Sequence, residues 1–202
     1  MKISLQNAGK RFNRDWIFRS CSINFLPNHS YAITGPNGSG KSTLLQVVAG
    51  ATLHSEGKII YTNNGQNSIS EPYQYISIAA PYLELVEEMT ATEMLQFHAA
   101  FKPLTKGVTE ILAAVQLEKS ASKQIRYFSS GMKQRLKLAQ AFFSDAPVLL
   151  LDEPTTNLDN EGIALYQYLI SQQLGKKLIL ISSNVEAEYE FCEEVVKMES
   201  YK

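Results

Sequence analysis

A short glycine-rich segment between an apolar stretch and a helical pattern constrains the fold more than any other feature. Residues 31–34 form a largely apolar run, as expected of a strand buried within a parallel sheet. Residues 35–43 follow with three glycines, and residues 44–49 then have a helical pattern that Gly50 closes. A strand, a tight loop and a helix in this order form the repeating unit of α/β proteins. We therefore predict an α/β core built around this segment.

The glycine-rich loop has the residues needed to hold a chain of phosphates. It matches the pattern G-x-x-x-x-G-K-[ST] in full, in the strand-to-helix context that this pattern requires. Its glycines let backbone N–H groups converge on one anion, and the helix N-terminus adds a partial positive charge. Lys41 would reach the β- and γ-phosphates of ATP, and the Ser42 hydroxyl would ligate Mg²⁺. Rather than a turn without a ligand, the pattern predicts a nucleotide site made of Gly35, Pro36, Asn37, Gly38, Ser39, Gly40, Lys41, Ser42 and Thr43.

Residues 148–151 form a second apolar run, and two carboxylates follow it directly. At the carboxyl end of a strand in an open α/β sheet, such side chains face the ligand crevice. Asp152 would hold Mg²⁺, and Glu153 would orient and polarise the water that attacks the γ-phosphate. An acidic N-cap after a strand is the alternative, but Pro154 and the upstream phosphate loop favour catalysis. The sequence therefore predicts hydrolysis of ATP as well as its binding.

The remaining strands fall into two groups. Residues 178–181 predict a third buried parallel strand. Residues 3–6, 17–25 and 58–61 instead predict an antiparallel layer, followed by a turn at residues 63–65.

The middle of the chain, from about residue 90 to residue 118, has apolar residues at helical spacing. We predict a small helical unit inserted between the first and second of the three core strands. One side of its first helix is crowded by Met94, Leu95, Phe97, His98 and Phe101. The acidic stretch at residues 186–194 predicts the outer face of a last helix, without a function.

The overall composition narrows the functional classes. The chain has 202 residues and a net charge of -1, so it lacks the positive field that holds nucleic acid, and no nucleic-acid partner is expected. Cys21 and Cys192 lie far apart, and no His/Cys spacing matches a zinc site, so neither a disulfide framework nor a zinc site is expected. No apolar run approaches the roughly 18 residues of a membrane helix. The first residues lack the apolar stretch that a signal peptide requires. If this protein drives transport, another chain must form the path.

Residues 128–135, Phe-Ser-Ser-Gly-Met-Lys-Gln-Arg, distinguish this chain among proteins with a phosphate loop. They resemble the signature of ABC ATPases, commonly Leu-Ser-Gly-Gly-Gln before a basic helix start. Residues 156–159 look like the D-loop of that family, and Phe12 falls where the family has an aromatic that stacks on adenine. Thr90 and Glu93 match the opening of its helical subdomain. The resemblance covers about residues 3 to 196.

The resemblance implies a fold and a mode of action. The fold would be a P-loop ABC ATPase core, a mostly parallel sheet with flanking helices, together with an antiparallel β layer. A helical subdomain at about residues 84–130 would be inserted in a core of residues 1–83 and 131–202, all within a single domain. Ser129 and Gly131 would contact the nucleotide held by a second ATP-binding subunit, in a head-to-tail dimer that closes on ATP and loosens after hydrolysis.

The resemblance also implies partners. An integral membrane transporter subunit would form the transport path and hold this chain at the cytoplasmic face of the cell membrane. The chain looks most like the short ATP-binding subunits of heme-exporter-like and ABC-2-type exporters.

Asn184 departs from the family, because ABC ATPases generally carry a switch histidine at this position. Its amide can donate to the γ-phosphate, but it cannot carry a proton or a positive charge. Both Asn184 and Glu153 are thus candidate catalytic residues, and we predict slow or pH-insensitive hydrolysis with ATP binding intact.

The loop before the helical unit is the second departure. Ala80 and Pro81 stand where the family typically has a glutamine that contributes contacts to Mg²⁺ and water. The side chains that follow are expected to be exposed and suggest adaptation to an unusual membrane partner: Tyr82, Leu83 and Leu85.

Three functions remain open after these departures. The leading hypothesis is the ATP-hydrolysing subunit of an ABC transporter. A nucleotide-gated scaffold would bind ATP and dimerise but barely hydrolyse. A soluble ABC ATPase of repair, chromosome or translation function is the third, although such proteins carry long inserts or two cassettes.

Overall fold

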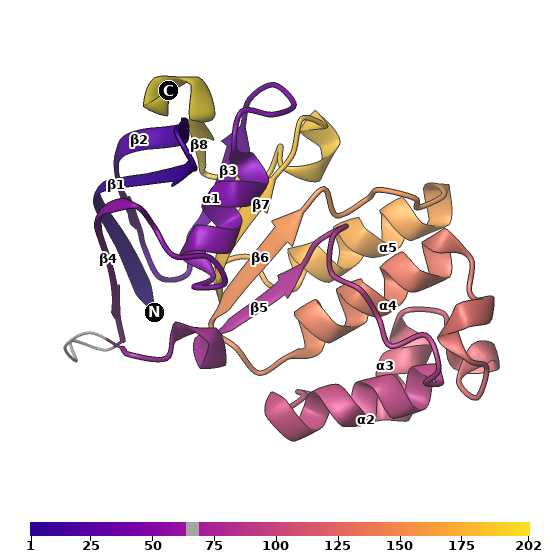
Figure 1. Ribbon diagram of the computed structural model, residues 1–202. Coiled ribbons are helices and arrows are strands. Elements are labelled where there is room, and N and C mark those ends of the chain that lie inside the picture. The colour runs from indigo at the N-terminus through magenta and orange to yellow at the C-terminus, as the bar shows by residue number, and fades with distance from the viewer. Residues whose placement is uncertain (64–68) are drawn as a thin grey trace.

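The computed structural model describes residues 1–63 and 69–202 and contains two sheets (Figure 1). The larger sheet has the strand order β5-β6-β7-β3-β8, and every neighbouring pair runs parallel. The apolar runs predicted as core strands are confirmed as β3, β6 and β7, which are neighbours in this sheet. Its strands are β3 (Ser30–Thr34), β5 (Ile76–Ala79), β6 (Val148–Asp152), β7 (Leu178–Ser182) and β8 (Glu194–Lys197).

The smaller sheet is antiparallel, with the strand order β2-β1-β4. It consists of β1 (Lys2–Phe12), β2 (Asp15–Phe25) and β4 (Glu56–Thr62), which confirms the predicted N-terminal layer with longer strands than expected. The turn predicted at residues 63–65 falls on residues 64 and 65, outside the described part of the chain.

Five α-helices surround the parallel sheet in the described part of the chain. They are α1 (Lys41–Val48), α2 (Ala91–Phe101), α3 (Val108–Ala114), α4 (Ser130–Phe143) and α5 (Asn160–Ser171). Short 3-10 turns occupy Pro72–Tyr75, Glu118–Ser120, Ile125–Tyr127, Glu186–Glu188 and Met198–Tyr201. The predicted helical unit is therefore present and lies between β5 and β6.

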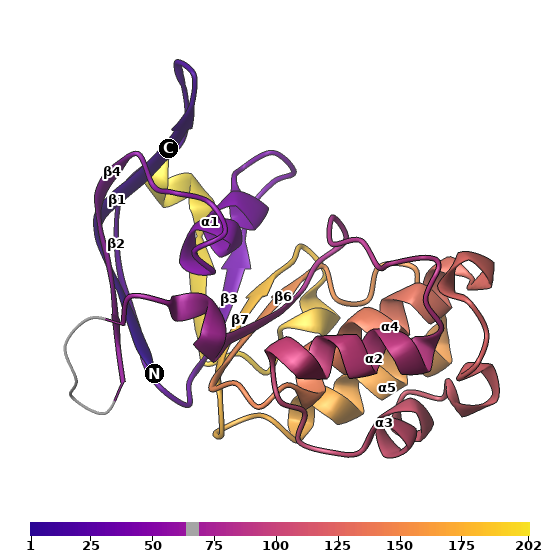
Figure 2. The same ribbon diagram turned by 60° about the horizontal axis from the view of Figure 1, so that its bottom comes forward.

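The two faces of the parallel sheet enter two separate cores. Successive side chains of a strand point to opposite faces. Leu149 and Leu151 of β6 accordingly pack with the helices α2 to α5, whereas Val148 and Leu150 pack with α1 and the antiparallel sheet. Figure 2 shows α1 between the two sheets, and α2 to α5 on the other side. Because both faces are covered, the β6 strand can be apolar throughout up to its terminal carboxylate.

The start of α2 is stabilised by a reciprocal cap. The Thr90 hydroxyl accepts a hydrogen bond from the Glu93 backbone N–H at 3.2 Å, and the Glu93 carboxylate accepts one from the Thr90 backbone N–H at 2.8 Å. These two bonds satisfy backbone donors that the first helical turn would otherwise leave unpaired. Capping of this helix therefore explains the Thr-x-x-Glu pattern. It sets the point at which the helical unit begins.

Two strands and one helix differ from the sequence prediction. β5 was not predicted, because its residues Ile-Ser-Ile-Ala do not form a continuous apolar run. The predicted last helix at residues 186–194 is wrong: this segment holds a 3-10 turn at Glu186–Glu188, and β8 begins at Glu194. β8 is a short strand at the edge of the sheet and pairs on one side only, so its exposed charged residues, Glu194 and Lys197, are compatible with a strand.

The predicted apolar side of the first inserted helix is partly wrong. Met94 and Leu95 are buried, whereas Phe97 and Phe101 are exposed. The two phenylalanine rings pack edge to face, with their centroids 5.1 Å apart. Residues four apart share a stripe on a helix, and this stripe lies beside the buried one. Within residues 1–63 and 69–202, no helix combines the length and the apolar character needed to span a membrane.

Candidate nucleotide-binding site

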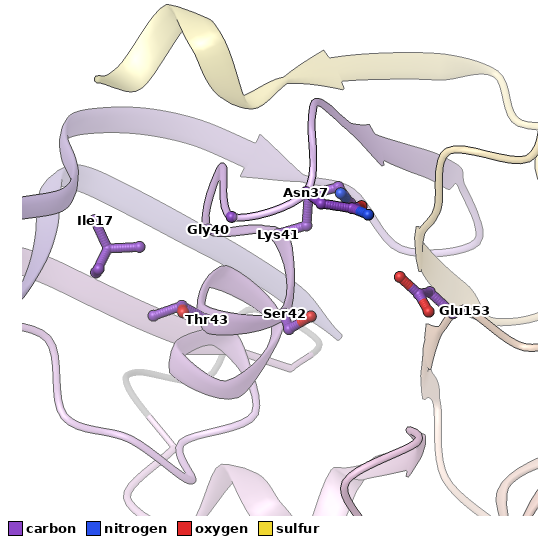
Figure 3. A pocket seen from close by; sticks show the side chains of 8 residues that line it. Ile17, Asn37, Gly40, Lys41, Ser42, Thr43 and Glu153 are labelled. Carbon is purple, nitrogen blue, oxygen red and sulfur yellow. The ribbon is translucent and has the colours of Figure 1, made fainter.

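A cavity of about 390 Å³ opens over the loop between β3 and α1 (Figure 3). Figure 3 shows Glu153, at the end of β6, facing this loop from the opposite side. The structure therefore brings together the two segments that the sequence predicted to meet. The cavity is lined by Ile17, Asn37, Gly38, Gly40, Lys41, Ser42, Thr43 and Glu153.

The Lys41 side chain holds the loop in its curled form. Lys41 is 6% exposed, and its ammonium donates to the carbonyl oxygens of Gly35 at 2.7 Å and Pro36 at 3.3 Å. Gly40 has a φ of 100°, and a Cβ there would lie 2.6 Å from a methyl carbon of Ile17. Glycine is required at this position both for the backbone angle and for the space. The loop is thus shaped before any ligand enters, with its backbone wrapped around a positive charge.

Asp152 fits the role of a metal ligand. It is 2% exposed, and its Oδ1 has no hydrogen-bond partner among the described residues. A buried carboxylate oxygen without a donor is costly unless a cation or water satisfies it. Oxygen ligands of this kind suit Mg²⁺, and the Ser42 hydroxyl in the adjacent cavity is of the same chemical type. Ser39 is buried in the same loop, and its hydroxyl likewise finds no partner in the described part of the chain.

Glu153 has an unusual backbone conformation. Its φ is 44°, in the left-handed region that non-glycine residues rarely adopt, and its side chain is exposed at the cavity. The Glu153 N–H donates to the carbonyl of Ser182 at 2.9 Å, and the Glu153 carbonyl accepts from the Thr156 N–H at 3.1 Å. Strained backbone of this kind persists only where surrounding contacts determine it, and it is often found at functional sites.

Asn184 lies against the phosphate loop. Its Nδ2 donates to Oδ1 of Asn37 at 3.0 Å, although the two residues are 147 positions apart. Both line a second cavity of about 310 Å³, which Glu153 also lines. Asn184 therefore lies beside the phosphate loop and shares a cavity with Glu153.

The signature segment forms a separate cavity of about 400 Å³. Ser129 caps α4, because its hydroxyl accepts from the Met132 N–H at 3.2 Å. A Cβ on Gly131 would come within 3.0 Å of the Asn157 carbonyl, so the signature and the D-loop segment pack closely. This cavity and the Lys41 cavity share no lining residue.

Phe12 is the residue predicted to stack on adenine. It lies at the end of the β1–β2 hairpin, is 49% exposed, and has the Lys10 ammonium 4.6 Å from its ring centroid. It does not line the Lys41 cavity, whereas Ile17 of β2 does. An exposed ring remains available for stacking, but no described contact directs it to the loop.

The loop after β5 packs on α4 rather than projecting freely. The Lys137 ammonium donates to the Pro81 carbonyl at 3.0 Å. Of the three side chains expected to be exposed, only Tyr82 is exposed, whereas Leu83 and Leu85 are half-buried. That expectation is corrected because the loop turns back against the helix. With Glu84, Glu87 and Lys133, the segment borders a groove of about 310 Å³.

The acidity of Tyr82 responds to groups near the phosphate loop. Desolvation raises the pKa of Tyr82 to about 12, the negative charge of Asp152 adds to the shift, and a hydrogen bond with Gln46 of α1 opposes it.

Sequence reasoning missed two buried polar residues next to the turn that carries Glu153. Gln134 of α4 is 4% exposed, and its side chain donates to the Pro154 carbonyl at 2.8 Å. Glu188 is 2% exposed and accepts from the Thr155 N–H at 2.9 Å. Gln134 was available as part of the signature segment, whereas the acidic stretch around Glu188 gave no sign that one carboxylate is buried.

Known proteins resemble this chain over most of its length. One relative, the cytochrome c biogenesis ATP-binding export protein CcmA of Agrobacterium fabrum, is 31% identical over 188 residues, which cover 91% of this chain and 88% of that protein. A solved structure, a putative ABC transporter ATP-binding protein from Pyrococcus furiosus, has a TM-score of 0.84 at 20% identity and covers 100% of both chains. Another, a dimeric ATP-binding cassette in a post-hydrolysis state bound to ADP and Pi, has a TM-score of 0.83 at 21% identity, over 96% of this chain and 93% of that one.

These similarities agree with the fold and with the residues found at the candidate site. The solved structures share the fold. The ABC transporter family matches residues 18–156, which include the phosphate loop, the signature segment and the two carboxylates at the end of β6. This chain belongs to the ABC transporter family of ATP-binding proteins.

Proposed function

We propose that this chain is the ATP-binding and ATP-hydrolysing subunit of an ABC transporter, acting on a separate membrane-spanning subunit through closure of an ATP-dependent dimer. The observation that carries the proposal is the separation of two phosphate-binding surfaces on one chain. Lys41 and the N-terminus of α1 line one cavity, and Ser129 and the N-terminus of α4 line another, with no residue in common.

A second copy or a related subunit explains this separation. Helix N-termini attract anions, and the N-termini of α1 and α4 lie at two different cavities. In a head-to-tail dimer, the Lys41 loop of one subunit and the Ser129 turn of its partner hold the same triphosphate. Closure then depends on the γ-phosphate, because ATP contacts both subunits and ADP lacks the group that joins them.

The roles of the catalytic residues follow from their positions. Ser42 and Asp152 would hold Mg²⁺, which would supply positive charge to the β- and γ-phosphates. Glu153 orients and polarises the attacking water from the far side of the cavity. Ser129 and Gly131 contact the partner's nucleotide, and Phe12 stacks on the adenine. Asn184 donates its amide toward the γ-phosphate from its place beside Asn37.

The relatives support transport as the process that is driven. Named relatives include the cytochrome c biogenesis export protein CcmA and a Nod factor export ATP-binding protein of Rhizobium. We infer that this chain works beside an integral membrane subunit, at the cytoplasmic face of the membrane. Residues 84–130 would form the helical subdomain that faces that subunit, inserted in a core of residues 1–83 and 131–202.

The neutral amide of Asn184 favours slow hydrolysis of ATP. If hydrolysis were too slow to measure, the chain would act as an ATP-gated scaffold. A neutral amide gives a weaker hydrogen bond to a phosphate than a charged donor does. The rate of hydrolysis, rather than the affinity for ATP, should carry this difference.

The test is phosphate release under steady-state conditions by the wild-type chain, with its membrane partner present. Glu153→Gln should abolish release while ATP still binds, and the exposed carboxylate variant Glu190→Gln should leave release unchanged. Chelation of Mg²⁺ should also stop the reaction. Binding of ATP without measurable, Glu153-dependent release would instead support the scaffold, and release that persists in Glu153→Gln would contradict the assigned catalytic role.

A further inference from the structure

The most unusual group outside the assigned site is the buried carboxylate of Glu188. It lies on the 3-10 turn Glu186–Glu188, four residues after Asn184, and is 2% exposed. Its Oε1 accepts hydrogen bonds from both the backbone N–H of Thr155, at 2.9 Å, and the Thr155 hydroxyl. The carbonyl of Glu188 accepts from the Tyr166 hydroxyl at 2.6 Å, which fixes the turn to α5. Its other carboxylate oxygen, Oε2, has no partner among the described residues.

Stability alone does not explain a carboxylate at this place. A buried carboxylate is costly unless it is paired with a cation, and among the described residues Glu188 forms no ion pair. An apolar side chain of similar size would fill the space at lower cost. The two bonds to Thr155 are what the carboxylate adds.

Thr155 belongs to the turn that carries Glu153. Two backbone hydrogen bonds hold Glu153 in its positive φ: its N–H donates to Ser182, and its carbonyl accepts from Thr156. The Thr156 hydroxyl also donates to the Glu153 carboxylate, at 3.5 Å. Glu188 fixes the middle of this turn from one side by binding Thr155. On the other side, Gln134 binds the carbonyl of Pro154 at 2.8 Å.

Glu188 also lies at the cavity where the assigned residues meet. Asn37, Glu153, Thr155 and Asn184 line the same space of about 310 Å³. The segment from Asn184 to Glu188 therefore contacts the phosphate loop at one end and the catalytic turn at the other.

We propose that Glu188 is a positioning residue for ATP hydrolysis. By binding Thr155, it holds the turn that carries Glu153, so that the Glu153 carboxylate stays directed toward the attacking water. This proposal rests on the proposed function. Glu188 does not touch the nucleotide; it acts through Thr155 and joins the segment that begins at Asn184 to the turn that carries the catalytic carboxylate.

Two variants of Glu188 separate the hydrogen bonds from the charge. Glu188→Gln keeps an oxygen that accepts both bonds from Thr155, so its maximal rate should stay within about threefold of the wild type. Glu188→Ala removes both bonds, and a misplaced catalytic group should lower the maximal rate roughly 10- to 100-fold. The dissociation constant for ATP should change less than about twofold, because neither variant alters the Lys41 loop.

Thr155→Val provides a second route to the same conclusion if Glu188→Ala does not fold. It removes only the hydroxyl donor, so the maximal rate should fall roughly 2- to 10-fold at unchanged ATP affinity. Where Glu188→Ala is folded, adding Thr155→Val should cause no further loss, since the bond is already gone. Circular dichroism and thermal unfolding report whether each variant is folded.

The outcomes distinguish this proposal from the proposed function. Suppose that the wild type shows Glu153-dependent hydrolysis, and that folded Glu188→Ala, or Thr155→Val, hydrolyses ATP at the wild-type rate. This result would overturn the role of Glu188 and leave the proposed ATPase function intact. Glu188→Gln as slow as Glu188→Ala would also overturn it, because the charge and not the pair of hydrogen bonds would then matter. Absence of Glu153-dependent hydrolysis in the wild type would count against the proposed function itself.

Discussion

The contact between Asn184 and the phosphate loop allows the effect of one substitution on the rate to be worked out. The Asn184 amide already reaches Asn37, at 3.0 Å, so a histidine at this position would start from the same backbone beside the same cavity. Loss of one positioned donor to a developing negative charge costs roughly 10²–10³ in rate, or about 2.7–4 kcal/mol. Charge-assisted hydrogen bonds are roughly twice as strong as neutral ones, so the amide should supply about half of this. Asn184→His should recover the other half, about 1.4–2 kcal/mol, which is roughly a 10- to 30-fold increase in turnover.

Phosphate release measured from pH 6 to pH 9 tests this prediction. The gain should be largest at low pH and shrink as the pH rises above the pKa of the new imidazole, ordinarily about 6.5, because only the protonated ring supplies the charge. The wild type lacks this group and should not show the corresponding fall in rate. Asn184→Ala should be slower than the wild type at unchanged ATP affinity. A turnover of Asn184→His equal to that of the wild type at pH 6 would refute the reasoning.

Two further predictions concern the helical unit. Thr90→Ala removes the hydroxyl that accepts from the Glu93 N–H, and it should lower the free energy of unfolding by about 1 kcal/mol, seen as a lower urea midpoint at unchanged slope; an unchanged midpoint would show that the cap contributes nothing. Burial, aided by the charge of Lys102, lowers the pKa of His98 below its ordinary 6.5. Below pH 6.5 the unfolded chain therefore takes up a proton that the folded chain does not, and stability should fall as the solution is acidified. His98→Gln should remove this part of the pH dependence in urea unfolding at pH 5 and pH 7, and an identical dependence in both proteins would contradict the assignment.

The nucleotide site was predictable because its information is local. The phosphate loop needs glycines where the backbone angle is positive, a lysine and a hydroxyl within nine consecutive residues, and all of these are visible in the sequence. β6 was equally clear, since burial on both faces makes it continuously apolar before Asp152. The structure places these two segments around one cavity, as sheet topology requires.

The rest depended on contacts between distant residues. β8 exposes both Glu194 and Val195 and pairs with β3 on one side only, so it shows neither the apolar run nor the alternation that would identify a strand in the sequence. Glu188 looks like any other member of an acidic stretch until the fold brings it to Thr155, 33 residues away. No local pattern distinguishes a buried carboxylate from a solvated one, because the distinction lies in its partner.

The central claim is that one triphosphate is held by the Lys41 loop of one subunit and the Ser129 turn of another. Sedimentation of the Glu153→Gln variant with Mg²⁺ and ATP tests it most directly, with ADP as the reference nucleotide and with the natural companion subunits added in parallel. We expect a dimer with ATP, a monomer with ADP, and loss of the ATP dimer in a Glu153→Gln chain that also carries Ser129→Arg but still binds ATP. A chain that remains monomeric with ATP even beside its companions, or a dimer indifferent to Ser129→Arg, would contradict the account.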